Sequence, residues 1–463
     1  MIITREIINK NIIFKDIIDP NTDVVTDYSY QELSEAIDIC KNILQKNHNA
    51  KPGETALIAT NPGKMQIALI FACMELDITI IVVDYDSSSN WEEGEYIDSK
   101  TKALLPITYF ILEEDTNQTK KYKLFRKICD KVIVLQNETI DRTPNDTLWS
   151  TKDSIVIKCT SSGTTGTPKL IEHTHEFMYN LINRNRKFFD GSVGLLFNLN
   201  HGSSVATYFL PAIMSEKVER MYSIFWTHTS KTIISDINHI MIPYPHYISR
   251  FLANNLSSNS ELIVYTLSTI KREWLQLVKD NKIKDVVSIF GSNETSGPVL
   301  INKATDQYFY ESKYRAVDDF YTINLSDKGE FLVTLPYYNK TINTNDTFRF
   351  KNDNYYHLGR NDLIRVNGMS VEIVDYQNKA KENLDADLVF DSVRNEIYLA
   401  VWTNDSDINN KVKTIDAYLR GKSNNTHYIS NHEVLDLNKF VSGVKVDQEK
   451  LRDYFRNHAA KKS

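Results

Sequence analysis

Residues 160–169 read Thr-Ser-Ser-Gly-Thr-Thr-Gly-Thr-Pro-Lys and directly follow an apolar run, 154–159, that predicts one β-strand. Gly163 and Gly166 lack a Cβ, so the backbone can turn tightly there and approach an anion closely. Successive exposed N–H groups form an anion-binding concavity, hydroxyls add neutral donors, and Lys169 adds a point charge. The hydroxyls come from Thr160, Ser161, Ser162, Thr164 and Thr165. This loop predicts a polyphosphate site; a flexible Ser/Thr/Gly linker is the alternative, and the glycine spacing excludes a Walker A loop.

The bulk composition is that of an ordinary globular protein with several domains. The chain has 463 residues, of which 41% are hydrophobic and 25% are charged, which is enough for two or three domains and a large core. A net charge of -6 argues against a nucleic-acid partner. The most membrane-like stretch, 65–83, is interrupted by Glu75 and Asp77, so we expect no membrane span.

The four cysteines lie far apart and form no CxxC pair. This spacing disfavours a structural metal site or a disulfide framework. The first residues show no basic start followed by an apolar core, so they do not indicate a signal peptide. We therefore expect reduced, buried thiols in a cytoplasmic protein.

The order of apolar segments predicts an α/β fold. Two α/β units are expected near the start of the chain: a helix at 27–44 with a strand at 55–58, and a helix around 67–73 with a continuous apolar strand at 78–83. Asp84 follows at the carboxyl end of the last strand, where open sheets bind ligands. Further strands are expected at 132–135, 154–159, 193–199 and 240–242. After 359–361 the pattern changes to a compact α+β unit, with a short segment at 365–373, strands at 386–390 and 397–401, and helices at 408–419 and from 448 onward.

A second group of polar residues ends a short apolar strand within 286–298. Phe290 could stack on a base, Asn293 could donate to a phosphate, and Glu294 could bind Mg²⁺ through oxygen. A turn with a solvated glutamate is the alternative. A third group joins Asp346, which could accept from ribose hydroxyls, to Arg360 in the run 359–368; a surface aspartate and arginine are the alternative here.

The order of these three groups, followed by a lysine near the C-terminus, resembles the adenylate-forming superfamily. That superfamily contains acyl- and aryl-CoA synthetases, nonribosomal-peptide adenylation domains and beetle luciferases. The resemblance extends from residue 28 to residue 452. It implies a large N-terminal domain of stacked α/β sheets, 1–359, and a small mobile α+β C-terminal lid domain, 360–463, which turns between two half-reactions.

The resemblance also implies roles for individual residues. The loop residues that match the positions holding the β- and γ-phosphates of ATP are Ser161, Ser162, Gly163, Thr164, Thr165, Gly166 and Lys169. Phe290 and Gly291 match the segment that flanks adenine, and Ser268 aligns with another adenine contact. Asn293 replaces the threonine that contacts the α-phosphate. Glu294 matches the Mg²⁺-associated glutamate, Asp346 the ribose-binding aspartate, and Arg360 the arginine beside it.

Two further residues match catalytic positions. His201 resembles the histidine that lines the carboxylate end of the acyl pocket, although a lone histidine is often structural. Lys445 resembles the lysine that bridges the substrate carboxylate and the α-phosphate, where an ammonium would neutralise developing charge. The extra residue Val444 departs from the family spacing, and an ordinary surface lysine is the alternative.

Two departures bear on the substrate. Thr266 and Leu267 occupy positions that are usually glycine, and Leu267 would fill the acyl tunnel, which favours a short or differently placed acid. The run 201–205 has no aspartate to pair with an α-amine, which disfavours an α-amino acid.

We therefore expect an ATP- and Mg²⁺-dependent ligase that activates a small carboxylic acid to an acyl-adenylate. The acyl group would then pass to the thiol of coenzyme A or of a carrier-protein phosphopantetheine. An acyl or peptidyl carrier protein is the possible protein partner. The alternatives are a non-catalytic nucleotide-binding relative and a ligase with an amine or hydroxyl acceptor.

Overall fold

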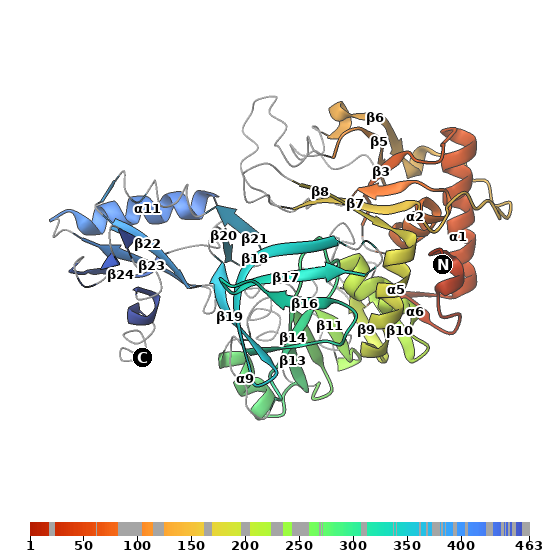
Figure 1. The fold of residues 1–463 in the computed structure, drawn as a ribbon. Helices are drawn as coiled ribbons and strands as arrows, with labels where there is room; N and C mark the ends of the chain where they lie inside the picture. Colours follow the sequence, from red (N-terminus) through yellow and green to blue (C-terminus); the bar gives the residue numbers. More distant parts are fainter. Residues whose placement is uncertain are drawn as a thin grey trace.

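The computed structural model places two large sheets with their helices within residues 13–360 and a small sheet near the C-terminus (Figure 1). The described residues are 1–17, 24–61, 63–81, 104–113, 125–161, 169–195, 204–223, 235–242, 259–267, 270, 272–306, 313–336, 338, 340–360, 363–366, 369–372, 380, 383–384, 386–391, 396–402, 406–422, 429–436, 439, 441–442, 445–446 and 451–455. The predicted class, α/β with large sheets and a small C-terminal α+β unit, is confirmed.

A six-stranded sheet in the order β6-β5-β3-β4-β7-β8 carries the first motif. Its first five strands pair in parallel, and β8 runs antiparallel to β7 at the edge. Every residue of β3 and β4 is buried, as expected for apolar strands of a parallel sheet covered on both faces. The bounds are β3 Thr55–Ala59, β4 Thr79–Ile81, β5 Ile107–Leu112, β6 Cys129–Val134, β7 Ile155–Ser161 and β8 Lys169–Thr174. The strands predicted at 55–58, 78–83, 132–135 and 154–159 correspond to β3, β4, β6 and β7, whose bounds differ by a few residues. Residues 82–84, with Asp84, lie outside the described residues.

A thirteen-stranded sheet in the order β16-β17-β18-β19-β15-β14-β13-β12-β11-β9-β10-β1-β2 carries the other two motifs. Neighbouring strands pair in parallel from β13 through β12, β11, β9 and β10 to β1. The neighbours from β16 to β13 pair antiparallel. The parallel part comprises β1 Ile13–Ile17, β9 Gly191–Leu195, β10 Val218–Ser223, β11 His239–Met241, β12 Ile263–Thr266 and β13 Asp285–Phe290. The antiparallel strands are β2 Val25–Tyr28, β14 Leu300–Lys303, β15 Lys313–Ala316, β16 Thr322–Leu325, β17 Glu330–Leu335, β18 Lys340–Lys351 and β19 Asn354–Arg360.

Helices α1, α2, α5 and α6 pack against these sheets in one shared hydrophobic cluster, whereas Trp274 of α9 belongs to a second cluster. Helix α1 begins with a capping box, in which Ser29 and Glu32 bond each other's backbone N–H groups. Helix α2 is apolar on nearly all sides and is buried along most of its length. The bounds are α1 Tyr30–Asn42, α2 Lys64–Glu75, α5 His175–Asn185, α6 Leu210–Met214 and α9 Arg272–Lys279. No helix among the described residues has the length and apolar character of a membrane span.

The C-terminal residues have hydrophobic clusters of their own. A three-stranded sheet, β22-β23-β24, packs with helix α11 around a cluster drawn from residues 380–429. In Figure 1 this unit lies at one end of the molecule, and the hairpin β20-β21 lies between it and β18. The bounds are β20 Leu363–Val366, β21 Met369–Glu372, β22 Ala386–Asp391, β23 Glu396–Val401, α11 Ile408–Lys422, β24 Ile429–Val434, β25 Val441–Ser442 and β26 Lys445–Val446. A domain boundary at 359/360 and lid movement stay predictions.

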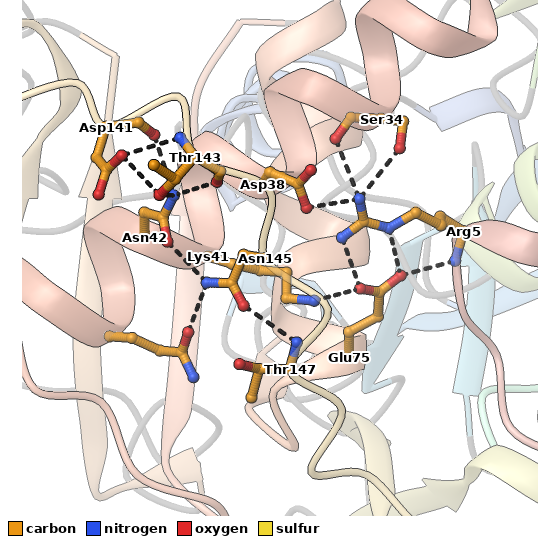
Figure 2. A network of polar contacts seen from close by, with 11 residues as sticks. Arg5, Ser34, Asp38, Lys41, Asn42, Glu75, Asp141, Thr143, Asn145 and Thr147 are labelled. Carbon is orange, nitrogen blue, oxygen red and sulfur yellow. Dashed lines mark hydrogen bonds and ion pairs between the residues drawn. The ribbon is translucent and has the colours of Figure 1, made fainter.

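A polar network joins the first residues of the chain to α1 and α2 (Figure 2). The carboxylate of Glu75 accepts from Arg5 Nη2 at 2.8 Å and from Lys41 Nζ at 2.8 Å. Arg5 also reaches Asp38 at 2.7 Å. Lys41 is only 1% exposed, so its ammonium depends on Glu75 in the dry interior.

All four cysteines are free and buried, as predicted. Burial raises the pKa of Cys40 and of Cys129 to about 12, so these thiols stay protonated at neutral pH. They are core residues and not nucleophiles.

Candidate nucleotide-binding site

The first motif begins and ends on two paired strands. Ser161 at the end of β7 pairs with Lys169 at the start of β8. Because β7 runs parallel to β4, the intervening loop leaves the carboxyl edge of the parallel strands, where α/β sheets bind ligands. The loop residues Ser162, Gly163, Thr164, Thr165 and Gly166 lie outside the described residues, as do the side chains of Ser161 and Lys169.

The second motif is a tight turn after the buried strand β13. At Gly291 an added Cβ would come within 2.4 Å of the Gly297 carbonyl oxygen, so the turn requires glycine there. Thr295 closes the turn, because its Oγ1 accepts from Ser292 N at 2.9 Å and lies 3.1 Å from the Gly297 oxygen. The turn therefore has a defined shape that presents Asn293 and Glu294.

The first and second motifs lie next to each other. His173 on β8 is within hydrogen-bond distance of the Asn293 carbonyl, with 2.9 Å between Nε2 and the oxygen. Burial lowers the pKa of His173 to about 4, although the Asn293 bond and the charge of Glu294 oppose this shift. Burial, with the charge of Glu294, raises the pKa of Cys159 on β7 to about 12. The turn that carries Glu294 thus lies against β8, the strand that follows the first motif.

The third motif lies beside the second. Asp346 on β18 is 2% exposed, and its backbone pairs with Arg360 on β19. Its Oδ1 lies 3.1 Å from Nε2 of His357. The His357 ring is 4.8 Å from the Phe348 ring and 5.8 Å from that of Phe290, measured between centroids.

Phe290 itself is 8% exposed and packs edge-on against Phe331 and Phe348. Its ring is therefore part of an aromatic cluster, and only a small part of it could meet adenine. That contact stays a prediction.

The remaining candidates are described only in part. His201 and Ser268 lie outside the described residues, and only the backbones of Arg360 and Lys445 are described. Lys445 begins β26 and pairs with Ser442 of β25. Thr266 is buried and Leu267 packs against the main hydrophobic cluster, where the sequence comparison placed the acyl tunnel.

The polar groups suit a nucleotide with its cation. Within the described part of the chain, no cluster of three or more His, Cys, Asp or Glu side chains forms a metal site. Mg²⁺ in nucleotide sites is held by one or two carboxylates, with phosphate oxygens and water as the other ligands. Glu294, which is half-buried and directly follows the Asn293 carbonyl contacted by His173, fits that donor set.

Sequence reasoning missed His173 and His357. Both are single histidines within strands. His173 contacts Asn293 of the second motif, which is 120 residues away in the sequence, and His357 contacts Asp346 on the neighbouring strand. A buried histidine directly after a phosphate loop, or opposite an expected ribose-binding aspartate, is the signal that could have indicated them.

Comparisons with known proteins show the family and the fold of the chain. A family model described as AMP-binding enzyme matches residues 15–315. The amide bond synthetase McbA from Marinactinospora thermotolerans is 13% identical, with 97% of this chain and 99% of that chain covered and a TM-score of 0.70. A double mutant of o-succinylbenzoate-CoA synthetase (MenE) from Bacillus subtilis, bound to a product analogue, is 13% identical, with 97% and 96% covered and a TM-score of 0.67. McyG A-PCP complexed with phenylalanyl-adenylate is 14% identical, with 99% and 96% covered and a TM-score of 0.64.

These identities show a shared fold and no more. Comparison with the curated proteins gives no significant match. The family model, however, spans well over half of the chain and includes the first two motifs. The protein therefore belongs to the AMP-binding, adenylate-forming enzyme family.

Proposed function

We propose that the protein is an ATP-dependent acid–thiol ligase that forms an acyl-adenylate and passes the acyl group to a thiol. The observation that carries the proposal is the meeting of three sequence motifs. The turn that carries Glu294 is joined to β8, the strand that follows the first motif, by the 2.9 Å contact between His173 Nε2 and the Asn293 carbonyl oxygen. His357 in turn contacts both Asp346 and the ring of Phe290.

In the first half-reaction a carboxylate oxygen attacks the α-phosphorus of ATP. The new P–O bond forms as the bond to the β-phosphate oxygen breaks, and pyrophosphate leaves. Attack by one anion on another requires donors and cations directed at the phosphate oxygens. The phosphate loop and Lys445 would provide these charges, and Asp346 would hold the ribose. A Mg²⁺ ion held by Glu294 would neutralise phosphate charge.

In the second half-reaction a thiolate attacks the acyl carbon, and AMP leaves as the acyl–phosphate bond breaks. The acceptor would be coenzyme A or a carrier-protein phosphopantetheine. Relatives of this fold include the CoA synthetase MenE and the amide bond synthetase McbA. An amine acceptor is therefore the second candidate, with the same first half-reaction.

The proposed substrate is a small carboxylic acid without an α-amine. Leu267 packs against the main hydrophobic cluster at the expected acyl position, which leaves less room there than glycine would. The run 201–205 has no carboxylate to pair with an ammonium group.

Pyrophosphate exchange with a panel of short aliphatic and aromatic acids tests the first half-reaction. At least one acid is expected to support exchange that depends on ATP and Mg²⁺. Glu294→Gln should abolish most of this exchange, whereas Glu261→Gln is the matched control because Glu261 is exposed and precedes β12, at the end of the parallel strands opposite to the turn that carries Glu294. ATP binding without exchange for any acid would instead indicate a non-catalytic relative.

The acceptor is then identified with the acid that supports exchange. Product analysis by mass spectrometry compares coenzyme A, a holo carrier protein and simple amines. A thioester product supports the proposal, and an amide formed in preference to a thioester contradicts its second half.

A further inference from the structure

We propose that His173 is a positioning residue that couples the strand leaving the phosphate loop to the turn that carries Glu294. The inference rests on the proposed function and adds to it a residue that holds two parts of the nucleotide site in register. His173 lies on β8, four residues after Lys169, and the Asn293 carbonyl that it contacts precedes Glu294 directly. The contact joins two segments that are 120 residues apart in the sequence.

The hydrogen-bond roles follow from the chemistry of the partners. A backbone carbonyl only accepts, so Nε2 of His173 carries the proton and donates across the 2.9 Å contact. The other ring nitrogen, Nδ1, is buried and has no partner among the described residues. His173 therefore holds the turn through a backbone carbonyl and not through the Glu294 carboxylate.

The ring has a fixed orientation on the strand side. It stacks on Phe177 of α5, with 5.1 Å between ring centroids and 18° between planes. Phe177 in turn packs against Tyr338, whose hydroxyl accepts from Thr174 N at 3.0 Å. The imidazole therefore cannot turn away from Asn293 without displacing neighbouring rings.

The turn is equally well defined on its own side. The Asn293 carbonyl also lies 3.2 Å from the Ser296 hydroxyl, which donates to it. Ser296 adopts a positive φ of 48°, and the Thr295 carbonyl accepts from Tyr321 at 2.7 Å. A displacement of β8 would thus be transmitted to Glu294 through His173.

The chain supplies a matched control two residues away. His175 is also buried, and burial lowers its pKa to about 4. Its Nδ1 accepts from Ile3 N at 3.0 Å, so it holds the N-terminal segment and not the Glu294 turn. Substitution of either histidine should lower stability, but only His173 should affect Mg²⁺ binding.

The test measures ATP binding by calorimetry over a range of Mg²⁺ concentrations, without any acid substrate. His173→Phe keeps a ring on Phe177 and removes the donor. We expect it to raise the Mg²⁺ concentration needed for half-maximal ATP binding about 10- to 100-fold, as is typical when a residue that orients a metal ligand is lost. ATP binding in the presence of a chelator should change much less. His173→Gln, which keeps a donor, should lie closer to the wild type.

The outcomes separate the inference from the proposed function. A folded His173→Phe protein with wild-type Mg²⁺ dependence overturns the inference, and so does an equal shift in His175→Phe. If His173→Phe does not fold, the same Mg²⁺ titration is made with His173→Leu. His173→Gln must then need less Mg²⁺ for half-maximal ATP binding than His173→Leu. A wild-type protein that binds no ATP overturns the proposed function as well.

Discussion

Glu75→Gln removes the charge at the centre of the polar network drawn in Figure 2. In the wild type, one carboxylate receives Arg5 through Nε at 3.0 Å and Nη2 at 2.8 Å, the Arg5 backbone N–H at 2.9 Å and Lys41 Nζ at 2.8 Å. The side chains of Glu75 and Lys41 are 6% and 1% exposed. Glutamine keeps the shape but leaves the Lys41 ammonium without a counter-charge.

The expected cost follows from this burial. Removing one partner of a buried ion pair typically costs about 3–5 kcal/mol, because an uncompensated charge stays in the interior. Arg5 retains Asp38 at 2.7 Å, so we expect the lower half of that range, about 3–4 kcal/mol. A large domain loses roughly 2 °C of Tm per kcal/mol, which gives a decrease of about 6–8 °C.

Thermal denaturation followed by circular dichroism measures the decrease in Tm. The pH dependence of Tm gives a second measurement. Burial opposes ionisation of Glu75, but Arg5 and Lys41 outweigh it and lower the pKa below 4.5. A lowered folded pKa contributes stability above pH 4.5 that is lost as the pH falls through the folded value. Between pH 4.5 and the folded pKa of Glu75, the stability of Glu75→Gln should therefore fall less steeply with decreasing pH than that of the wild type.

Two variants serve as controls. Lys41→Met combined with Glu75→Gln removes the stranded ammonium and should recover much of the lost stability. Glu261→Gln breaks an exposed pair with Lys284 and should cost less than about 1 kcal/mol. If Glu75→Gln changes Tm no more than Glu261→Gln does, the argument from burial is wrong.

The remaining predictions concern the nucleotide site. Gly291→Ala should destabilise the protein by about 1–3 kcal/mol and lower the rate of pyrophosphate exchange, because the new Cβ meets the Gly297 backbone at 2.4 Å. In Gly297→Ala the new Cβ meets only a leucine side chain that can shift. Denaturation curves should therefore show a smaller loss of stability for Gly297→Ala. His357→Phe removes the donor to Asp346. It should raise the KM for ATP about tenfold with a smaller change in kcat, since hydrogen bonds to charged groups contribute about 1.5–3 kcal/mol. An unchanged KM would contradict this prediction. Lys445→Ala should lower the adenylation rate by more than tenfold in single-turnover assays while ATP affinity changes little, and equal losses in both would point to a binding role.

The strands and helices of the large unit could be predicted because their apolar residues are local signals. The buried runs of β3 and β4, and the apolar helix α2, are visible in the sequence without knowledge of their neighbours. The family could also be predicted, since Gly163, Glu294 and Asp346 stand within recognisable motifs, whereas their individual roles stay predictions.

The partners of those motifs could not be predicted from the sequence. His173 donates to a backbone carbonyl 120 residues away, and a carbonyl carries no sequence signal. His357 approaches Asp346 only because β18 and β19 pair in one particular register, which depends on the bulge between Thr347 and Phe348. The burial of Phe290 among other aromatic rings likewise depends on how β13 packs against β17 and β18.

The position of β1 has a consequence for synthesis of the protein on the ribosome. This strand pairs in parallel with β10, with Ile13 opposite Arg220. The nascent chain must therefore extend past residue 223 before its first strand can be placed between its neighbours. Until then β1 and β2 can form at most a two-stranded hairpin, which is marginally stable in water. Slow translation before β10 would thus prolong the exposure of apolar Ile12 and Phe14, and a chaperone that binds short apolar segments would have its target at the very start of the chain.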